Sequence, residues 1–309
     1  MKTHPHSISL RLTVGVCALL MSFGALAAES GKFDFTQAGR TVPVWFSVPK
    51  DARPDAPVLF VMHGVKRDAE RYRNDWLPHA EKSGFILVAP EFSEANFPGA
   101  DAYNYGGTVD AKGQPRPREE WAFSYIEPIF DAMKARTGNR SARYHLYGHS
   151  AGAQFVHRYL YFVPGARVVT AVAANAGWWT LPDQTTKFPY GLRGSVVGEA
   201  GLKAMLQRPL VILLGTADTD PNHPELRRTP EAMAQGPHRF ARGQFFFAAG
   251  QKQAAALGVP LGWKLATAPG IAHHDKGMAA FAVDWLFGRQ AAVSTGPDRE
   301  PLPSARAKK

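Results

Sequence analysis

The sequence has only one cysteine, Cys17, and it lies in an apolar stretch close to the N-terminus. Basic residues precede this stretch, residues 12–26, and the small residue Ala27 follows it. A basic start, a short apolar run and a small-x-small site are typical of a secretory signal peptide, here cleaved near Ala27. We therefore expect residues 1–27 to be removed and the protein to be exported, to the periplasm or beyond. The rest of the chain would have no cysteine for a disulfide, a thiol nucleophile or a metal site.

Beyond that stretch the chain also lacks long hydrophobic runs and a concentrated basic stripe. No apolar run there reaches the roughly 18 residues of a membrane-spanning helix. The formal charge is +10, but the basic residues are spread along the chain, so nucleic-acid binding is not predicted. A solvated surface drawn to anionic polymers fits this distribution better. Residues 289–309 have almost no large apolar side chain and are predicted to be a disordered tail.

What the chain does have is an alternation of short apolar runs and amphipathic stretches. Residues 33–48 alternate apolar and polar side chains around a glycine turn, which predicts an antiparallel hairpin. Continuous apolar runs separated by helical stretches predict an α/β fold, with a mainly parallel sheet of eight strands covered on both faces. One domain over residues 28–288 is expected. The runs are 58–62, 85–89, 144–147, 168–174, 210–214 and 263–267, and the helical stretches are 69–82, 119–137, 151–162, 239–257 and 277–287.

Two connections in this pattern are too long to be simple turns, residues 91–118 and 176–208. Long loops at the carboxyl ends of strands are where folds of this class build their sites. The second connection contains a helix-like piece at 195–207, so we predict that residues 176–208 form a small lid.

The stretch LYGHSAGAQ, residues 146–154, places Ser150 between Gly148 and Gly152, after an apolar run and before a helical one. A strand that turns tightly into a helix forces an unfavourable backbone angle on the residue at the apex, and glycines permit the close approach that the turn needs. The apex side chain would stand at a helix N-terminus, where negative charge is favoured. We expect Ser150 to be a nucleophile; the alternative is a small residue at an ordinary turn.

A serine hydroxyl is a poor nucleophile until a base takes its proton. His149 and His157 lie close to Ser150 in the chain but are expected to be packing or surface residues. The stretch APGIAHHDKGM, residues 268–278, offers two histidines after the last apolar run. We prefer His273 as the base and expect His274 to cap the following helix.

The base needs a carboxylate that fixes its tautomer. The stretch GTADTDPNH follows a strand of the buried type and offers Asp218, with Asp220 as the second choice. The D-x-D-x-N spacing does not continue as a calcium loop, because its sixth position is His223 and its twelfth is Thr229. No metal and no cofactor is predicted.

The order Ser150, Asp218, His273, each after a different predicted strand, resembles the α/β-hydrolase superfamily. The resemblance covers roughly residues 33–287. Within the superfamily, the VMHG of residues 61–64, the serine turn and the late GIAH resemble the polyhydroxyalkanoate-depolymerase and feruloyl-esterase branch, whose histidine stands three residues after a glycine.

This resemblance implies an oxyanion hole, in which N–H groups face the charge that builds on the attacked carbonyl oxygen. One donor would be the backbone amide of Ala151, the residue after the nucleophile. The other would be the amide of Val65, which follows His63-Gly64. The imidazole of His63 is expected to brace this loop.

Aromatic side chains gather in the two long connections and are expected to line an apolar or polymer-binding cleft. Adjacent tryptophans on an extended segment face opposite ways, so we expect one of Trp178 and Trp179 in the cleft and the other in the core. Several of the aromatic side chains would equally pack the loops onto the domain. The pocket candidates are Phe92, Tyr105, Trp178 and Trp179, with Phe97 and Tyr103 beside them.

Together these features predict a secreted serine hydrolase that cleaves carboxylic esters through an acyl-enzyme, without a cofactor. Its substrate would be a small-molecule or polymeric ester: a short-chain ester, a polyester or an aromatic ester. A serine peptidase, an acyltransferase and a non-catalytic scaffold protein are the alternatives. The sequence indicates no oligomeric state.

Overall fold

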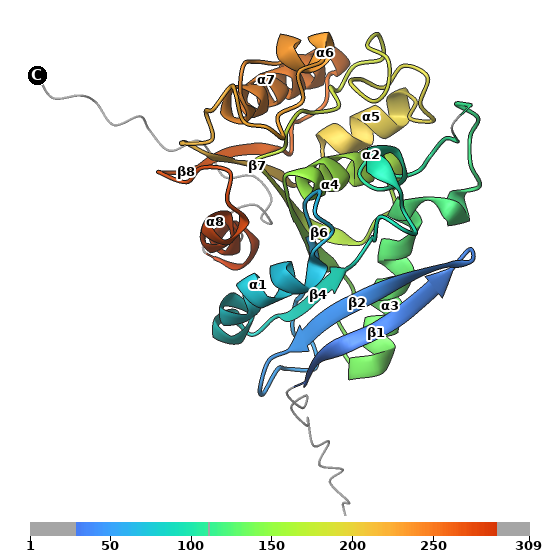
Figure 1. The fold of residues 1–309 in the computed structure, drawn as a ribbon, viewed down its shortest axis with the longest axis vertical. Helices are drawn as coiled ribbons and strands as arrows, with labels where there is room; N and C mark the ends of the chain where they lie inside the picture. Colours follow the sequence, from blue (N-terminus) through green and yellow to red (C-terminus); the bar gives the residue numbers. More distant parts are fainter. Residues whose placement is uncertain (1–28, 111, 289–309) are drawn as a thin grey trace, which may run out of the picture.

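The computed structural model describes residues 29–110 and 112–288, which form a twisted sheet with helices on both faces (Figure 1). The predicted signal peptide and the predicted disordered tail lie outside the described residues. The sheet has eight strands in the order β1-β2-β4-β3-β5-β6-β7-β8. The strands are β1 (Glu29–Gln37), β2 (Arg40–Val48), β3 (Val58–Met62), β4 (Ile86–Pro90), β5 (Tyr144–His149), β6 (Val168–Ala174), β7 (Leu210–Gly215) and β8 (Lys264–Ala268).

The pairing of the strands confirms the mainly parallel sheet. The strands β1 and β2 form the antiparallel hairpin that the alternating sequence predicts, and β2 pairs antiparallel with β4. Every later pair, from β4 to β8, is parallel. The carboxyl ends of these parallel strands therefore meet along one edge of the sheet, which is where an open α/β fold places its site.

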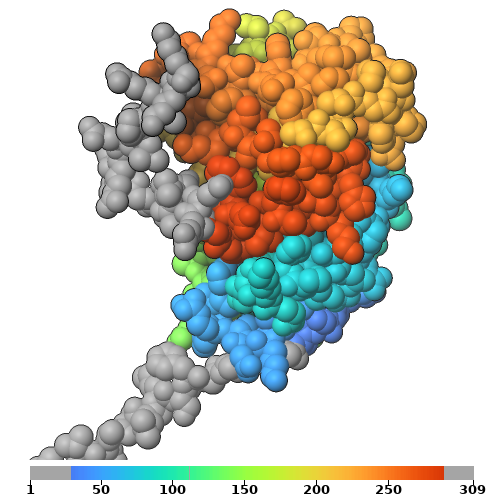
Figure 2. Space-filling view, turned by 90° about the vertical axis from the view of Figure 1, so that its left-hand side faces the viewer, coloured from blue at the N-terminus to red at the C-terminus, as the bar shows by residue number. Residues whose placement is uncertain are grey.

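The central parallel strands β3, β4, β5 and β7 are buried along their whole length because helices cover both of their faces. On β3, for example, Leu59 and Val61 pack toward one helical layer, while Phe60 and Met62 pack toward the other. The helices α1 and α8 cover the first face and lie side by side there (Figure 2), and α3, α4, α5 and α7 cover the second. The α-helices are α1 (Ala69–Ser83), α2 (Gly99–Ala102), α3 (Ile126–Thr137), α4 (Ala151–Phe162), α5 (Glu199–Leu206), α6 (Pro230–Ala234), α7 (Arg239–Leu257) and α8 (Asp275–Phe287).

One predicted helix begins later than its sequence pattern suggests. The stretch 119–137 was expected to be one helix, but residues 118–125 form two short 3₁₀ turns and α3 begins at Ile126. This start places Pro128 in the first turn of the helix. Backbone N–H groups in a first turn make no hydrogen bond within the helix, so the missing N–H of proline costs nothing there. The short helices α2 and α6 were not predicted, because four or five residues carry no helical period.

Candidate active site

Ser150 lies at the apex of a tight turn between β5 and α4, with φ of 57° and ψ of −116°. A positive φ is unfavourable for a residue with a side chain, so the surrounding structure must hold it. The flanking glycines make the turn possible. A Cβ at Gly148 would lie 2.2 Å from the carbonyl oxygen of Gly152, and a Cβ at Gly152 would lie 2.0 Å from that of Met62. The strand and the helix therefore approach more closely than any other residue type permits.

The structure brings three of the predicted residues into one hydrogen-bonded line. The Ser150 Oγ lies 3.1 Å from His273 Nε2, and His273 Nδ1 lies 2.8 Å from Asp218 Oδ2. Since the carboxylate accepts the Nδ1 proton, Nε2 is free to accept the proton of the serine hydroxyl. The three side chains follow β5, β7 and β8, so the common edge of the sheet is what assembles them.

The alternatives to these residues lie elsewhere. His274 is the N-cap of α8, where its side chain accepts a hydrogen bond from the amide of Gly277. Asp220 accepts a bond from the amide of Asn222 in its own loop. His157 lies on α4 and is buried against the loop after β6, where its Nε2 accepts the amide of Thr180. His149, expected to be a packing or surface residue, is buried and packs against His273, with 4.6 Å between the ring centroids.

Two backbone amides beside Ser150, one of them in the loop after β3, have no acceptor among the described residues. Val65 and Ala151 both lie beside Ser150, and within residues 29–110 and 112–288 neither backbone amide donates to a protein acceptor. His63 braces the loop, because Nδ1 donates to the carbonyl of Gly64 and Nε2 accepts the amide of Phe92. Burial lowers the pKa of His63 to about 4, so this imidazole is neutral at physiological pH.

On one side of Ser150 lies a cavity of about 340 Å³ that we call the aromatic cavity. Two of the pocket candidates, Tyr105 and Trp178, line it, with ring centroids 5.5 Å apart. Phe92 and Trp179 do not. Both are fully buried, Phe92 packs on Tyr103, and Trp179 stacks on Phe246 in the core. These two pocket assignments are corrected, because Phe92 also packs on Phe155 of α4 and Trp179 on His157 of α4, which leaves neither side chain at the cavity.

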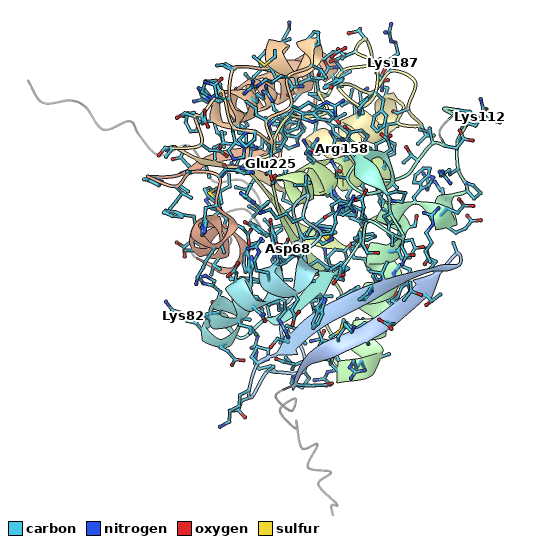
Figure 3. The ribbon with its side chains drawn as sticks, viewed as in Figure 1. Asp68, Lys82, Lys112, Arg158, Lys187 and Glu225 are labelled. Carbon is cyan, nitrogen blue, oxygen red and sulfur yellow. The ribbon has the colours of Figure 1, made fainter. Side chains whose placement is uncertain are left out.

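The remainder of the aromatic cavity is polar and basic. Arg227 and Arg239 line it beside Gln154 and Glu225. Behind it the guanidinium of Arg158 lies 4.4 Å from the ring centroid of Trp178 and 4.8 Å from that of Tyr105. Figure 3 shows Arg158 in the interior of the molecule, whereas Lys112 and Lys187 lie at its periphery. Among the described residues this buried guanidinium has no carboxylate partner, and its cation–π contacts hold the two rings.

A second cavity, of about 240 Å³, also borders Ser150, and we call it the polar cavity. It is lined by His273, by the loop after β3 and by the N-terminal ends of α1 and α8. The side chains that define it are Asp68, Arg71, Tyr72, His149, His273 and Asp275.

The comparison with solved structures decides which family this site belongs to. The structure matches that of poly(aspartic acid) hydrolase-1 from Sphingomonas sp. KT-1 with 50% sequence identity and a TM-score of 0.83. The match covers 84% of this chain and 99% of that one. The poly(3-hydroxybutyrate) depolymerase LpqC from Bordetella parapertussis matches over 87% of this chain and 95% of that one, at 36% identity and a TM-score of 0.81. The chain belongs to the α/β-hydrolase family. Within it, these two relatives confirm the depolymerase and esterase branch.

The other comparisons either support the fold without the activity or find no match. A ferulic acid esterase matches over 86% of this chain and 99% of that one, with a TM-score of 0.52 at 13% identity, which supports the fold but not the activity. Comparison with models of protein families finds no match, and comparison with curated proteins finds none.

Two residues of this hydrolase site were not predicted from the sequence. Arg239, the first residue of α7, reaches Asp218 Oδ1 with Nη1 at 3.5 Å and His223 Nδ1 with Nη2 at 3.2 Å. Asn175, at the end of β6, accepts the amide of Gly215 and donates to the carbonyl of Ala272. Arg239 thus holds the carboxylate, and Asn175 ties together the loops that carry the acid and the base.

The pKa of His273 is lowered from its ordinary value, mainly by burial and also by the positive charge of Arg239, although the bond to Asp218 opposes both. The imidazole of the hydrolase is therefore neutral, and able to accept a proton, at neutral pH. Among residues 29–110 and 112–288 no group of histidine and acidic side chains could hold a metal ion. No helix in the same residues is long and apolar enough to cross a membrane.

Proposed function

We propose that this hydrolase cleaves carboxylic esters through an acyl-enzyme, with Ser150 as the nucleophile, His273 as the base and Asp218 as the acid that orients it. The observation that carries the proposal is the hydrogen-bonded line from Ser150 Oγ through the imidazole to the carboxylate, at 3.1 and 2.8 Å. Membership of the depolymerase and esterase branch supports the same chemistry.

The geometry supports the following sequence of steps. His273 Nε2 takes the proton of Ser150 as Oγ bonds to the substrate carbonyl carbon, and the carbonyl oxygen becomes an oxyanion. The amides of Val65 and Ala151 donate to that oxyanion, and losing one such donor typically costs about 3 kcal/mol of barrier. The imidazolium then gives its proton to the leaving oxygen as the C–O bond breaks. Water repeats the steps on the acyl-enzyme and releases the acid.

A second candidate activity is the cleavage of amide bonds in an acidic polymer. The observation that favours it is the 50% identity to poly(aspartic acid) hydrolase-1. Poly(aspartic acid) is a polyanion, and Arg227 and Arg239 line the aromatic cavity, with Arg158 behind it. The guanidinium of Arg227 lies 5.5 Å from the ring centroid of Trp178 and 5.7 Å from that of Tyr190. Arg227 is exposed, so its guanidinium is accessible to a carboxylate of the polymer.

One panel of substrates separates these activities. We expect nitrophenyl esters to be hydrolysed, and Ser150→Ala to lower the turnover at least about 10³-fold. Release of acid from poly(3-hydroxybutyrate) would identify a polyesterase, and release of new amines from poly(aspartic acid) would identify an amidase. A Ser150→Ala variant with normal turnover on every substrate would contradict the proposal.

The remaining sequence predictions belong to the same proposal. Residues 176–208 would act as a lid over the aromatic cavity, which they line with Gly177 and Trp178. Export would follow cleavage near Ala27. If the acyl group were transferred to an alcohol in place of water, the protein would be an acyltransferase. If it had no catalytic activity, it would be a scaffold protein.

A further inference from the structure

The loop after β7 carries a histidine that the proposed reaction does not use, His223. Its ring centroid lies 5.4 Å from that of His273, and the two rings are nearly perpendicular, at 73°. The neighbouring Glu225, labelled in Figure 3, borders both cavities beside Ser150, but His223 is not among the described residues that line either of them. The side chain of His223 is therefore placed to act on the catalytic residues rather than on a substrate.

The hydrogen bonds to the His223 ring fix its tautomer. Nδ1 lies 3.2 Å from the backbone nitrogen of Glu225 and 3.2 Å from Nη2 of Arg239. Both partners can only donate, because neither a backbone N–H nor a guanidinium accepts a hydrogen bond. Nδ1 is therefore unprotonated, and the ring proton of the neutral imidazole resides on Nε2.

These two bonds connect three parts of the site. The amide of Glu225 belongs to a tight turn that the amide of Leu226 closes by donating to the carbonyl of His223 at 2.9 Å. Arg239 is the first residue of α7, and its Nη1 lies 3.5 Å from Asp218 Oδ1. Through Nδ1, His223 thus joins the turn beside the cavities, the start of α7 and the acid of the triad.

Arg239 has few contacts that could hold its charge in place. The side chain is 2% exposed, and its Nε has no hydrogen-bond partner among the described residues. The same residues offer the guanidinium two acceptors, Asp218 Oδ1 at 3.5 Å and His223 Nδ1 at 3.2 Å. The contact with Asp218 is long for a hydrogen bond between nitrogen and oxygen, so the bond to His223 is what fixes the orientation of the guanidinium.

Other carboxylates compete for this guanidinium. Glu225 and Asp220 lie within electrostatic range of Arg239, and both are exposed. Without an acceptor at the position of Nδ1, the guanidinium would turn toward these two carboxylates and away from Asp218. The positive charge that helps to keep the imidazole of His273 unprotonated would then lie farther from it.

We propose that His223 is a positioning residue of this hydrolase, because its Nδ1 holds the guanidinium of Arg239 against Asp218 and so sets the charge beside the catalytic base. This inference rests on the function proposed above. His223 forms no bond with the substrate and acts through two other side chains, the guanidinium and the carboxylate. The property that matters is therefore the acceptor at Nδ1, and not the ring or the charge of the histidine.

Two substitutions of His223 separate the acceptor from the ring. In His223→Asn, Oδ1 is bonded to Cγ as Nδ1 is, so it can accept hydrogen bonds from the same two donors. In His223→Leu, a side chain of similar size has no acceptor. His79→Leu is the matched control, because it removes a partly buried imidazole from the C-terminal half of α1.

The measurement is kcat/KM on a nitrophenyl ester across pH, since the acidic limb of this profile reports the pKa of the base. We expect His223→Leu to move the limb to higher pH by about half a pH unit, while His223→Asn and His79→Leu leave it in place. Arg239→Gln should move the limb in the same direction, and adding His223→Leu to it should give no further shift.

The outcomes separate the two proposals. An unmoved limb in His223→Leu overturns the positioning role, and so does an equal shift in His223→Asn, which would come from loss of the ring itself. Additive shifts in the double variant, or no shift in Arg239→Gln, overturn it as well, because His223 would then not act through the guanidinium. Circular dichroism checks that each variant folds, and His223→Ala replaces His223→Leu if that variant does not. A wild-type protein that hydrolyses no ester overturns the proposed function itself.

Discussion

His273 and His274 are adjacent in the chain, yet the structure gives their side chains different tasks. His273 lies between Ser150 and Asp218, while His274 accepts the amide of Gly277 at the start of α8. The difference follows from where α8 begins, since His274 is its N-cap residue and His273 still belongs to the loop after β8. Sequence alone offered both as the base.

Replacing each histidine separately tests this division. We expect His273→Ala to lower kcat at least about 10³-fold, because among the described side chains it is His273 that hydrogen-bonds to the serine hydroxyl. His274→Ala removes only a helix cap and should lower the free energy of unfolding by about 1 kcal/mol with activity nearly intact. Kinetics on a nitrophenyl ester and urea unfolding measure the two effects. The reverse pattern would make His274 the base.

Arg239 sets the charge next to the triad. The guanidinium lies 3.5 Å from Asp218, and the Arg239 and Asp218 side chains are 2% and 3% exposed, so solvent screens the pair weakly. Its positive charge opposes protonation of His273 and helps to lower the pKa of that imidazole. It therefore acts on the reaction through Asp218 and His273, as a positioning residue.

Arg239→Gln should move the acidic limb of the kcat/KM profile to higher pH. The limb reports the pKa of the base in the free enzyme, and loss of the neighbouring charge lets the pKa of His273 rise toward its ordinary value. Arg239→Lys restores the charge and should return the limb toward its original position. If the limb stays in place in Arg239→Gln, the guanidinium has no electrostatic influence on the base.

The strand–turn–helix from β5 to α4 is the element that the sequence predicts best. Its glycines and its apolar flanks are local features of the sequence. At either glycine, an added Cβ would lie less than 2.5 Å from a backbone atom, so the structure requires glycine there. The parallel sheet was also predictable, because most of its parallel strands are short, largely apolar runs. By contrast, Arg239, Asn175 and the polar cavity depend on which loops meet at the sheet edge, and no local pattern marks them.

The turn can be tested through Gly152. A Cβ there would meet the backbone of Met62 at 2.0 Å, so α4 would have to move away from β3 and take Ser150 with it. We expect Gly152→Ala to lower the free energy of unfolding by about 3 kcal/mol and to abolish activity. Gly165→Ala is the matched control, since nothing lies within 4 Å of its added Cβ. Equal urea midpoints in the two variants would refute the role of close approach.

At the scale of the whole molecule, the hydrolase buries several histidines in their neutral form. Burial lowers the pKa of each, to about 4 for His63 and His145 and well below the ordinary value for His149 and His157. Between pH 6.5 and 4 the unfolded chain binds protons at these sites that the folded chain does not. Stability therefore falls as the pH drops through this window.

Urea unfolding at pH 7.5 and pH 5 checks this expectation. Each such histidine contributes up to about 1.4 kcal/mol per pH unit, so the midpoint should be clearly lower at pH 5. Asp275 acts in the opposite direction, because burial raises its pKa to about 7 and the folded chain then holds the extra proton. The stability gained from this one carboxyl at low pH is smaller than the stability lost from the four buried imidazoles. An equal or higher midpoint at pH 5 would contradict the account.

The central claim is that Ser150 is an activated nucleophile, and intact mass spectrometry after treatment with a fluorophosphonate tests it most directly. We predict one adduct per chain, located on Ser150 by peptide mapping, at a rate that falls steeply in His273→Ala. The Ser150→Ala variant should gain no mass. A wild-type protein that folds normally and takes up no label, or takes it up at another residue, would contradict the account.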